Sequence, residues 1–280
     1  MAPPLQDPAV RSVLTIAGSD SGGGAGIQAD LKTFAAHGVH GLSALAALTA
    51  QHTRGVTSVH VPPIEFLRAQ LEACFEDFHI PVVKLGMLAS AEVIHTVADV
   101  LEAHRPEAVV LDPVMIATSG ARLLAPAALG ALRDRLLPLA SIVTPNAPEA
   151  ELLLDVPVRD HDDAEAALEA LLGMTGGAVL LKGGHLEGDD EVVDRFGHRD
   201  QRESFVHARL RVNGHGTGCT LASAIAANLC RGLSVREATH EATDYIHGAL
   251  LHAQRPGRSD VAVLHHLWSV KPPMVNIPQG

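Results

Sequence analysis

The chain has 280 residues, is 47% hydrophobic and carries a formal net charge of −11. A chain of this length can bury a large core without disulfides, and its acidic balance excludes nucleic acid and anionic membranes as expected partners, since both attract basic surfaces. The three cysteines form no CxxC pair, which favours a reducing compartment. Residues 1–10 lack a basic start and no apolar run reaches about 18 residues, so we expect a cytoplasmic protein without a membrane span.

Short apolar runs alternate with longer helical patterns along the chain. The runs predict strands at residues 13–17, 43–48, 82–85, 108–111, 141–143 and 178–181. Apolar residues at steps of three and four predict helices at residues 27–37, 64–79, 91–104, 126–137, 148–154, 163–172, 217–231 and 235–252. Ser90 and Ser234 are placed to cap two of these helices, and Gly38 to end the first. The alternation predicts an α/β fold with a mostly parallel sheet covered on both faces.

Three segments fall outside this alternation. Residues 187–203 are charged and interrupted by glycine, which predicts an exposed flap or an edge hairpin around Gly197 and His198. Residues 269–280 contain three prolines and little periodicity. We therefore expect a flexible N-terminus over residues 1–11, one domain over residues 12–268 and a C-terminal tail over residues 269–280.

The first predicted strand runs into a glycine-rich loop. Residues 18–26 read Gly-Ser-Asp-Ser-Gly-Gly-Gly-Ala-Gly, and such a loop lets backbone N–H groups approach a ligand, although a mobile turn has the same composition. No Gly-Lys-Ser/Thr follows and the GxGxxG pattern is not clean, which disfavours a P-loop enzyme and an ordinary dinucleotide dehydrogenase.

Polar and small residues also follow the other predicted strands, where an open parallel sheet binds its ligands. Gln51, Met87 and Val114 would form one mixed pocket there, although each also suits a turn or the core. Asn146 and Glu149 flank a helix start, so they suit a cap and a first-turn acid as well as a ligand site.

Two further strand-end residues carry charge. Asp112 lies near Asn146 and Glu149 in the predicted sheet, and these oxygen donors would hold Mg²⁺ through water. Lys182 follows an apolar run and precedes two glycines. We expect it to face a phosphate, with a solvated lysine as the alternative.

The strongest local pattern is Asn-Gly-His-Gly-Thr-Gly-Cys-Thr at residues 213–220, followed directly by an apolar helix. Small residues at a helix N-terminus create a concave set of N–H donors for an anion. Such a site suits phosphoryl transfer, in which an enzyme mainly positions the reactants and stabilises the charge of the transferring group.

Six ordered motifs point to one family. They are Ala-Gly-Ser-Asp with Ala-Gly-Ile-Gln-Ala-Asp-Leu-Lys at residues 17–20 and 25–32, Lys-Leu-Gly-Met-Leu at 84–88, Leu-Asp-Pro-Val-Met at 111–115, Thr-Pro-Asn at 144–146, Leu-Lys-Gly-Gly-His at 181–185 and Gly-His-Gly-Thr-Gly-Cys at 214–219. Over about residues 12–268 the chain resembles the hydroxymethylpyrimidine/phosphomethylpyrimidine kinases of thiamine biosynthesis. The resemblance implies the three-layer α/β/α ribokinase-like fold with a mostly parallel central sheet, a homodimer, and two successive uses of MgATP. The family phosphorylates 4-amino-5-hydroxymethyl-2-methylpyrimidine and then its monophosphate.

The resemblance also implies a role for each matching residue. The pyrimidine side comprises Gly18, Asp20, Ala25, Asp30, Gln51, Met87 and Val114. The ATP side comprises Asn146, Thr217 and Lys182, and Mg²⁺ belongs at Asp112 and Glu149. Gly216, Thr217 and Gly218 match an anion hole, with Cys219 at the catalytic position where most ribokinase-like enzymes carry aspartate. Because Cys219 begins a helix, we expect a lowered pKa and a thiol that acts as a base.

The chain departs from the family pattern in two places. Thr118 and Ala121-Arg122 stand where many relatives carry lysine and an acidic residue, which leaves a lysine contribution from that loop unassigned. The chain also continues beyond the usual end near Trp268, so the tail has no assigned role.

Three other functions fit part of the sequence. A pyridoxine or pyridoxal kinase of the same superfamily also phosphorylates a flat ring with a hydroxymethyl group, but Gln51, Met87 and Cys219 favour the pyrimidine. A cysteine hydrolase built on Cys219 and His215 explains none of the strand-end motifs. A non-catalytic ligand-binding regulator is disfavoured because the whole anion-hole segment is retained.

Overall fold

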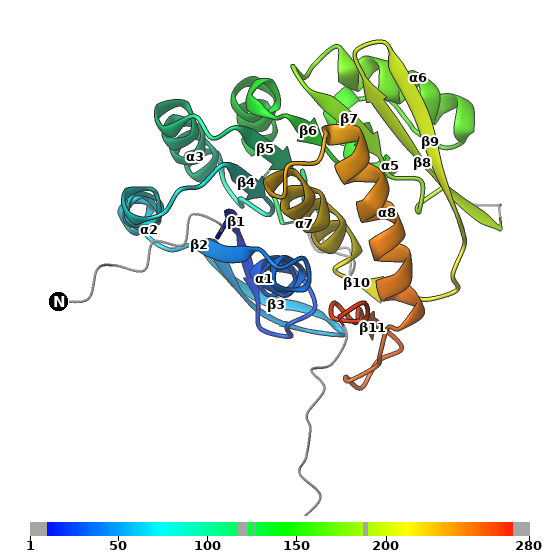
Figure 1. Ribbon diagram of the computed structural model, residues 1–280, viewed down its shortest axis with the longest axis horizontal. Coiled ribbons are helices and arrows are strands. Elements are labelled where there is room, and N and C mark those ends of the chain that lie inside the picture. Colours follow the sequence, from blue (N-terminus) through cyan, green and yellow to red (C-terminus); the bar gives the residue numbers. More distant parts are fainter. Residues whose placement is uncertain (1–9, 117–122, 126, 187–189, 271–280) are drawn as a thin grey trace, which may run out of the picture.

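The computed structural model describes residues 10–116, 123–125, 127–186 and 190–270. Its centre is a nine-stranded sheet with the order β3-β2-β1-β4-β5-β6-β7-β8-β9 (Figure 1). The pairs from β2 to β7 are parallel, whereas β3 at one edge and β8 and β9 at the other pair antiparallel. The predicted α/β fold with a mostly parallel sheet is confirmed.

The strands differ widely in length. They are β1 (Ser12–Asp20), β2 (His40–His52), β3 (Gly55–His60), β4 (Val82–Leu85), β5 (Ala108–Leu111), β6 (Ile142–Val143), β7 (Ala178–Leu181), β8 (Glu191–His198), β9 (Gln201–Ala208), β10 (Gly214–His215) and β11 (Ala262–Val263). The last two form a separate parallel pair.

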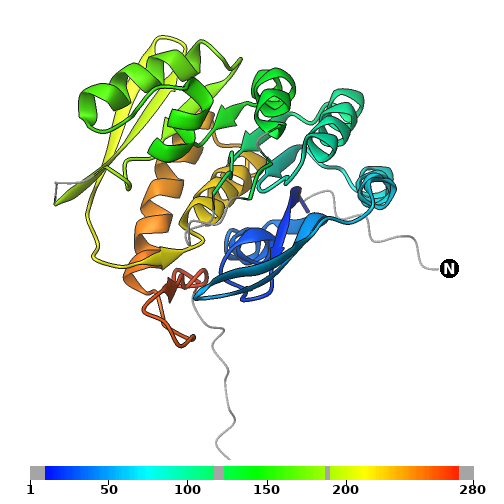
Figure 2. The ribbon, with the colours of Figure 1, turned by 180° about the vertical axis from the view of Figure 1, so that it is seen from behind.

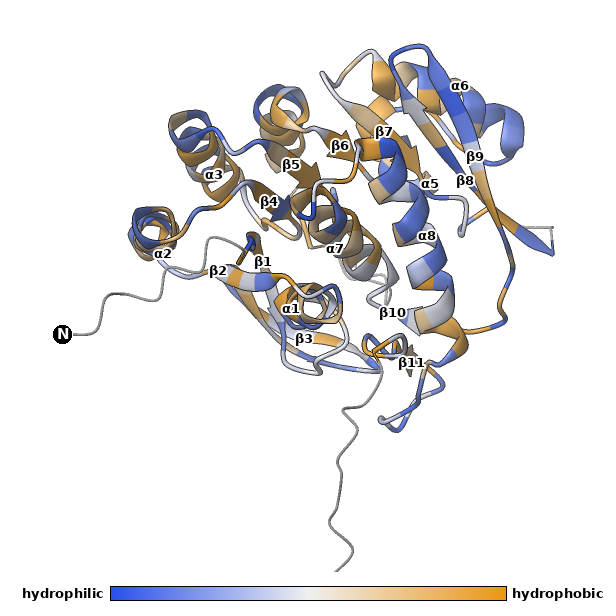
Figure 3. Cartoon of the chain, viewed as in Figure 1, coloured by the Kyte–Doolittle hydropathy of each residue, from blue (hydrophilic) through white to orange (hydrophobic). Residues whose placement is uncertain are grey.

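Helices cover both faces of the sheet (Figures 1 and 2). They are α1 (Gly26–Ala36), α2 (Ile64–Asp77), α3 (Ala91–His104), α4 (Ala128–Ala131), α5 (Ala147–Leu154), α6 (His161–Leu172), α7 (Thr217–Cys230) and α8 (Val235–Leu251). One apolar cluster joins the sheet to α2, α3, α5 and α6, and a second joins it to α1, α7 and α8. Apolar residues gather where these helices meet the strands, and polar residues mark the outer side of α8 (Figure 3). This is the predicted three-layer arrangement.

The buried strands agree best with the sequence predictions. The bounds of β4, β5 and β7 are those predicted, as are those of α3. A strand buried on both faces is a continuous apolar run, so both of its ends are visible in the sequence. Ser90 and Ser234 cap α3 and α8 by accepting the backbone N–H of the third helical residue, and Gly38, with φ of 70°, follows the end of α1.

Two elements correct the predictions. Strand β3 was not predicted, because most of its side chains are exposed and it pairs with β2 through its backbone. The predicted helix at residues 126–137 is shorter: α4 ends at Ala131, a π-helical turn covers Leu132–Leu136, and a 3₁₀ turn covers Leu137–Leu139. Pro138 in that last turn has no N–H to continue an α-helix. Pro126 lies outside the described residues.

The predicted hairpin at Gly197 and His198 is confirmed, because β8 and β9 pair antiparallel across a two-residue turn. The expectations for residues 1–9, for residues 271–280, and for the departures at Thr118, Ala121 and Arg122 concern positions outside the described residues. Among the helices that the structure does describe, none has the length and apolar character to cross a bilayer.

Candidate active site

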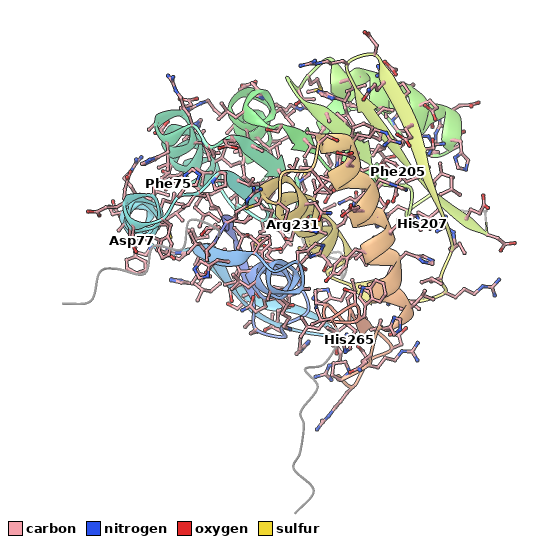
Figure 4. All side chains as sticks on the ribbon, viewed as in Figure 1. Phe75, Asp77, Phe205, His207, Arg231 and His265 are labelled. Atoms are coloured by element: carbon pink, nitrogen blue, oxygen red, sulfur yellow. The ribbon has the colours of Figure 1, made fainter. Side chains whose placement is uncertain are left out.

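A cavity of about 680 Å³ lies at the carboxyl ends of the central parallel strands. All but one of the predicted site residues line it: Gly18, Asp20, Ala25, Gln51, Met87, Asp112, Val114, Asn146, Glu149, Lys182, Gly216, Thr217, Gly218 and Cys219. The wall also reaches His207 on β9, beside α8 (Figure 4). In an open parallel sheet, ligands bind at the carboxyl ends of the strands. The fold brings residues up to 201 positions apart in sequence, from Gly18 to Cys219, together there.

Asp20 holds the glycine-rich loop in shape. Its Oδ1 accepts the N–H of Gly22 at 2.7 Å, and its Oδ2 accepts those of Gly24 at 3.0 Å and Ala25 at 2.8 Å. Although burial opposes the charge, His215 and the N–H groups of Gly22 and Ala25 lower the pKa of Asp20. Both carboxylate oxygens of Asp20 thus already accept hydrogen bonds from the protein. Its contribution to a substrate site is to order the loop.

His215 joins this loop to the segment that begins α7. Its Nε2 lies 3.0 Å from Asp20 Oδ2 and 3.1 Å from Gln51 Nε2. At the neighbouring Gly216, φ is 82° and an added Cβ would collide with the carbonyl oxygen of Gly24, so the two loops touch through their backbones. Within the described residues, the side chain of His215 therefore bonds to Asp20 and Gln51 and not to Cys219. This geometry disfavours a Cys-His hydrolase pair.

The wall expected to face a pyrimidine is mostly apolar. A Cβ at Gly18 would lie 3.0 Å from Met87 Sδ, so this glycine lets the methionine approach the backbone. Val114 and Ala25 are half-buried beside them. Gln51 places an amide at this wall, with its Oε1 3.0 Å from Thr49 Oγ1. A flat ring with one or two polar atoms suits such a surface.

Asp30 is the predicted residue that does not line the cavity. Its buried carboxylate accepts bonds from Lys84, Thr15 and Ser223. The expectation of a direct substrate contact is therefore corrected: Asp30 lies behind the wall and its oxygens are already used. Lys84, which pairs with it, does line the cavity. The sequence analysis assigned no role to Lys84, because it lies within the apolar pattern of a buried strand.

A second buried charge cluster lies at the ends of β5 and β7. Lys182 Nζ lies 3.0 Å from Asp112 Oδ1 and 3.7 Å from Glu149 Oε2. Burial alone would lower the pKa of Lys182, but the two carboxylates raise it overall. Burial raises the pKa of Glu149 to about 7, which Lys182 opposes and Asp112 reinforces. The solvated lysine considered above is excluded, since only 13% of the Lys182 side chain is exposed.

Asn146 and Glu149 also form a capping box at the start of α5. Asn146 Oδ1 accepts the Glu149 N–H, and Glu149 Oε2 accepts the Asn146 N–H, each at 2.9 Å. Asn146 and Glu149 therefore do cap the helix, which the sequence analysis gave as the alternative to a ligand site. It does not remove them from the cavity, whose wall they also form.

The donor set at this cluster fits Mg²⁺. Asp112 and Glu149 offer carboxylate oxygens, the ligands that Mg²⁺ takes in small number while it keeps water or phosphate oxygens. In the described part of the chain no group of three or more His, Cys, Asp or Glu residues forms a metal cage. Two carboxylates beside a space for phosphates are nevertheless what a nucleotide-borne Mg²⁺ requires.

The start of α7 lies in the cavity wall, where the sequence analysis expects an anion site. Its N-cap is Gly216, which has no side chain to accept the first N–H groups of the helix. A Cβ at Gly218 would lie 3.0 Å from Lys182 Nζ, so the backbone here passes close to the charge cluster. The first N–H groups of a helix, beside a lysine, suit a phosphoryl group.

The expected acidity of Cys219 is wrong for the free protein. Burial raises the pKa of its thiol to about 11, and Asp30 and Asp112 add to this effect. Lys84 and a hydrogen bond from the Gly26 backbone lower the pKa, but not enough to offset burial. Desolvation therefore outweighs the effect of the helix terminus on the pKa of Cys219, and this thiol is neutral in the free protein.

The fold is that of a ribokinase-like kinase. The model of the family described as phosphomethylpyrimidine kinase matches residues 20–264, and the chain belongs to this family. It is 48% identical over 262 residues to the hydroxymethylpyrimidine/phosphomethylpyrimidine kinase of Rhizobium meliloti, covering 91% of this chain and 97% of that one. It is 46% identical over 244 residues to the enzyme of the same name from Escherichia coli, covering 86% and 91%.

Solved structures give the same superfamily. The phosphomethylpyrimidine kinase of Clostridium difficile superposes with a TM-score of 0.76 at 42% identity, covering 85% of this chain and 98% of that one. The pyridoxal kinase of Staphylococcus aureus, solved with AMP-PCP and pyridoxal, superposes with a TM-score of 0.86 at 30% identity, covering 94% and 96%. Overall shape thus does not separate the two activities, whereas sequence identity favours the pyrimidine kinases.

Proposed function

We propose that this kinase transfers the γ-phosphoryl group of ATP to 4-amino-5-hydroxymethyl-2-methylpyrimidine, and then a second one to the resulting monophosphate. The observation that carries the proposal is the glycine-capped start of α7, which faces the same cavity as the apolar wall at Gly18, Met87 and Val114. A phosphoryl group and a flat ring would meet there. The family membership and the identity to the pyrimidine kinases support this substrate.

The cavity residues near α7 and α5 have separate roles in binding the phosphates and Mg²⁺. The N–H groups of Thr217, Gly218 and Cys219 stabilise the charge of the transferring group, and Lys182 holds a phosphate of ATP. Asp112 and Glu149 would hold Mg²⁺, which supplies charge neutralisation on the phosphates when bound. Asn146 shapes the start of α5 beside them.

Cys219 acts on the acceptor oxygen. The alcohol proton passes to the sulfur as the oxygen attacks phosphorus and the bond to ADP breaks. Since burial raises the pKa of the thiol to about 11, the sulfur must first lose its own proton, or else it only accepts a hydrogen bond that orients the alcohol. In that second case the anion site would supply most of the catalysis.

The cavity volume supports two successive transfers. Pockets for drug-sized ligands measure about 300–1,000 Å³, so one of about 680 Å³ can hold a small ring together with part of a nucleotide. The monophosphate would enter with its phosphate toward the α7 terminus. Accumulation of monophosphate alone in an assay would refute the second step and leave the first intact.

Two further features belong to the proposal: a cytoplasmic location and a homodimer. The edge strand β3 and its surroundings expose large apolar side chains, namely Val59, Val61 and Phe66. An unpaired edge next to apolar residues is suited to an interface between copies of the chain. Light scattering should give twice the chain mass, and Val59→Glu should reduce it to the monomer value.

A pyridoxal kinase is the second candidate, favoured by the close superposition on the enzyme from Staphylococcus aureus. The deciding experiment incubates the protein with MgATP and each ring alcohol separately, and identifies products by mass. We expect mono- and diphosphate from the hydroxymethylpyrimidine, at a higher kcat/KM than any phosphate formed from pyridoxal or pyridoxine. A preference for pyridoxal would overturn the proposal.

A further inference from the structure

Gln51 is held at the cavity wall through both its backbone and its side chain. A shift of register between Ala50 and Gln51 interrupts the pairing of β2 with β3, and such bulges change the direction of the side chains beside them. The hydroxyl of Ser21 donates to the Gln51 carbonyl and accepts the Gln51 N–H, each at 2.8 Å. The side-chain amide lies between Thr49 and His215. Gln51 therefore has a fixed place, and these two neighbours determine how its amide is turned.

The hydrogen on the ring of His215 follows from its contact with Asp20. Asp20 Oδ2 accepts the N–H groups of Gly24 and Ala25 and lies 3.0 Å from His215 Nε2. A carboxylate oxygen only accepts hydrogen bonds, so Nε2 must carry a hydrogen and donate it. This holds both for the neutral ring with its hydrogen on Nε2 and for the ring that is protonated on both nitrogens. Toward Asp20 and toward Gln51, His215 Nε2 thus presents an N–H and no lone pair.

Thr49 sets the complementary requirement on the other side of the amide. Its Oγ1 lies 2.9 Å from the carbonyl oxygen of Ser19 and 3.0 Å from the Gln51 amide. A carbonyl only accepts, so the single hydrogen of the hydroxyl goes to Ser19 and a lone pair is left toward Gln51. An N–H of the amide fits this lone pair, and the amide oxygen fits the N–H of His215. Half a turn of the amide about its last bond exchanges two groups of nearly equal size and gives this orientation.

We propose that His215, held by Asp20, is a positioning residue that fixes the Gln51 amide with its oxygen toward His215 and its nitrogen toward Thr49, and so selects the acceptor ring. The inference rests on the proposed place of Gln51 in the ring site. An amide has two N–H groups and two lone pairs on its oxygen, and Thr49 and His215 use one of each. One N–H and one lone pair remain for a ligand. They match a ring that carries an amino group beside a ring nitrogen, as 4-amino-5-hydroxymethyl-2-methylpyrimidine does.

A fixed amide discriminates between rings by the order of their donors and acceptors. In the 4-oxo analogue of the pyrimidine, a ring N–H and a carbonyl oxygen replace the ring nitrogen and the amino group, so donor and acceptor change places. Against a fixed amide, N–H would face N–H and oxygen would face oxygen, and polar groups buried without partners are costly. An amide that is free to turn would accept either ring. The preference for the amino ring over the oxo ring therefore measures how firmly His215 holds Gln51.

The first test needs neither ATP nor a ring. In protein whose histidines are isotope-labelled at the ring nitrogens, nitrogen NMR shifts show which of the two nitrogens carries a hydrogen. The signals of His215 are those that are lost in His215→Gln. We expect a hydrogen on Nε2 of His215. A bare Nε2 would overturn the proposal, because it would accept from the amide nitrogen of Gln51 instead.

The second test compares the two rings in the kinase assay. His215→Leu removes the ring N–H, whereas His215→Gln places an amide N–H near the position of Nε2. We expect His215→Leu to lower the preference, which is the ratio of the two kcat/KM values, by about tenfold or more, since it removes the bond that holds the amide. The KM for ATP should be unchanged, and His215→Gln should restore most of the preference. Loosening of the glycine-rich loop alone would lower the activity on both rings together and leave their ratio as it was.

A Gln51→Leu background shows whether His215 acts through the amide. Without the amide the preference between the rings should be small, and adding His215→Leu should change it no further. An unchanged preference in His215→Leu, or a further change of preference when it is added to Gln51→Leu, would overturn the proposal. Absence of product from the unchanged protein with the amino ring would instead overturn the proposed function. The hydrogen on Nε2 would then still decide how the amide is turned, because that measurement needs no activity.

Discussion

Replacing Glu149 by glutamine isolates the charge of one buried group. Glutamine has the same size, and at the third position of a helix it can accept the N–H of the capping residue as glutamate does. The capping box with Asn146 should therefore persist. What the substitution removes is the negative charge beside Lys182 and Asp112.

The size of the effect follows from the shift in acidity. Burial raises the pKa of Glu149 from 4.5 to about 7, so the folded protein holds this proton more tightly than the unfolded chain does. The native protein then loses stability as the pH rises from the unfolded value of about 4.5 through about 7. Because one pKa unit corresponds to about 1.4 kcal/mol, the loss reaches about 3 kcal/mol at most. The glutamine variant has no such loss.

Denaturant unfolding at pH 5 and pH 8 measures the difference. At pH 5 the two proteins should have nearly equal free energies of unfolding, whereas at pH 8 Glu149→Gln should be more stable by up to about 3 kcal/mol. Glu92→Gln is the matched control, since it makes the same chemical change at an exposed position in the first turn of another helix, α3. A constant difference between Glu149→Gln and the unchanged protein would refute the reasoning.

Four other outcomes are expected. In a magnesium titration of kinase activity, Glu149→Gln should need more Mg²⁺, because one candidate oxygen ligand loses its charge; overlaid curves would leave Glu149 as a helix acid alone. Gln51→Leu should raise the KM for the pyrimidine by an amount equivalent to about 1–3 kcal/mol and leave the KM for ATP unchanged, and an unchanged acceptor KM would remove Gln51 from the ring site. Cys219→Ala should lower kcat by about 10² to 10⁴ and change either KM much less; a kcat within a few fold of the unchanged enzyme would make the anion site the main source of catalysis. Gly216→Ala should lower both stability and kcat, since its φ of 82° and the carbonyl of Gly24 leave no place for a methyl group, and normal values of both would refute the close contact of the two loops.

The sequence predicted the centre of the fold better than its edges. Buried strands such as β4 and β7 are bounded by the ends of apolar runs, so their limits were found to the residue. Strand β3 pairs through its backbone and exposes most of its side chains, which leaves no apolar alternation to detect. The turns after Ala131 keep a helical pattern of leucines, and periodicity alone does not distinguish a π-helical or 3₁₀ turn from an α-helix.

The cavity wall was predicted where a residue lies at or just beyond a strand end, and it was missed where a residue's placement depends on a distant partner. Gln51, Met87 and Lys182 were found because strand ends converge at one edge of the sheet. Asp30 and Lys84 are 54 residues apart, and nothing local indicates that they pair. For Cys219, the local rule that a helix start favours a thiolate was outweighed by burial, which depends on the whole fold.

The bonds of Asp20 have a consequence for the entropy of binding. A loop with four glycines in five positions has many conformations in an unfolded chain, and ordering it on ligand binding would weaken affinity. Here one carboxylate already accepts the N–H groups of Gly22, Gly24 and Ala25, so this ordering occurs during folding. The ligand then meets a loop that is set in advance, and more of its contact energy remains as affinity.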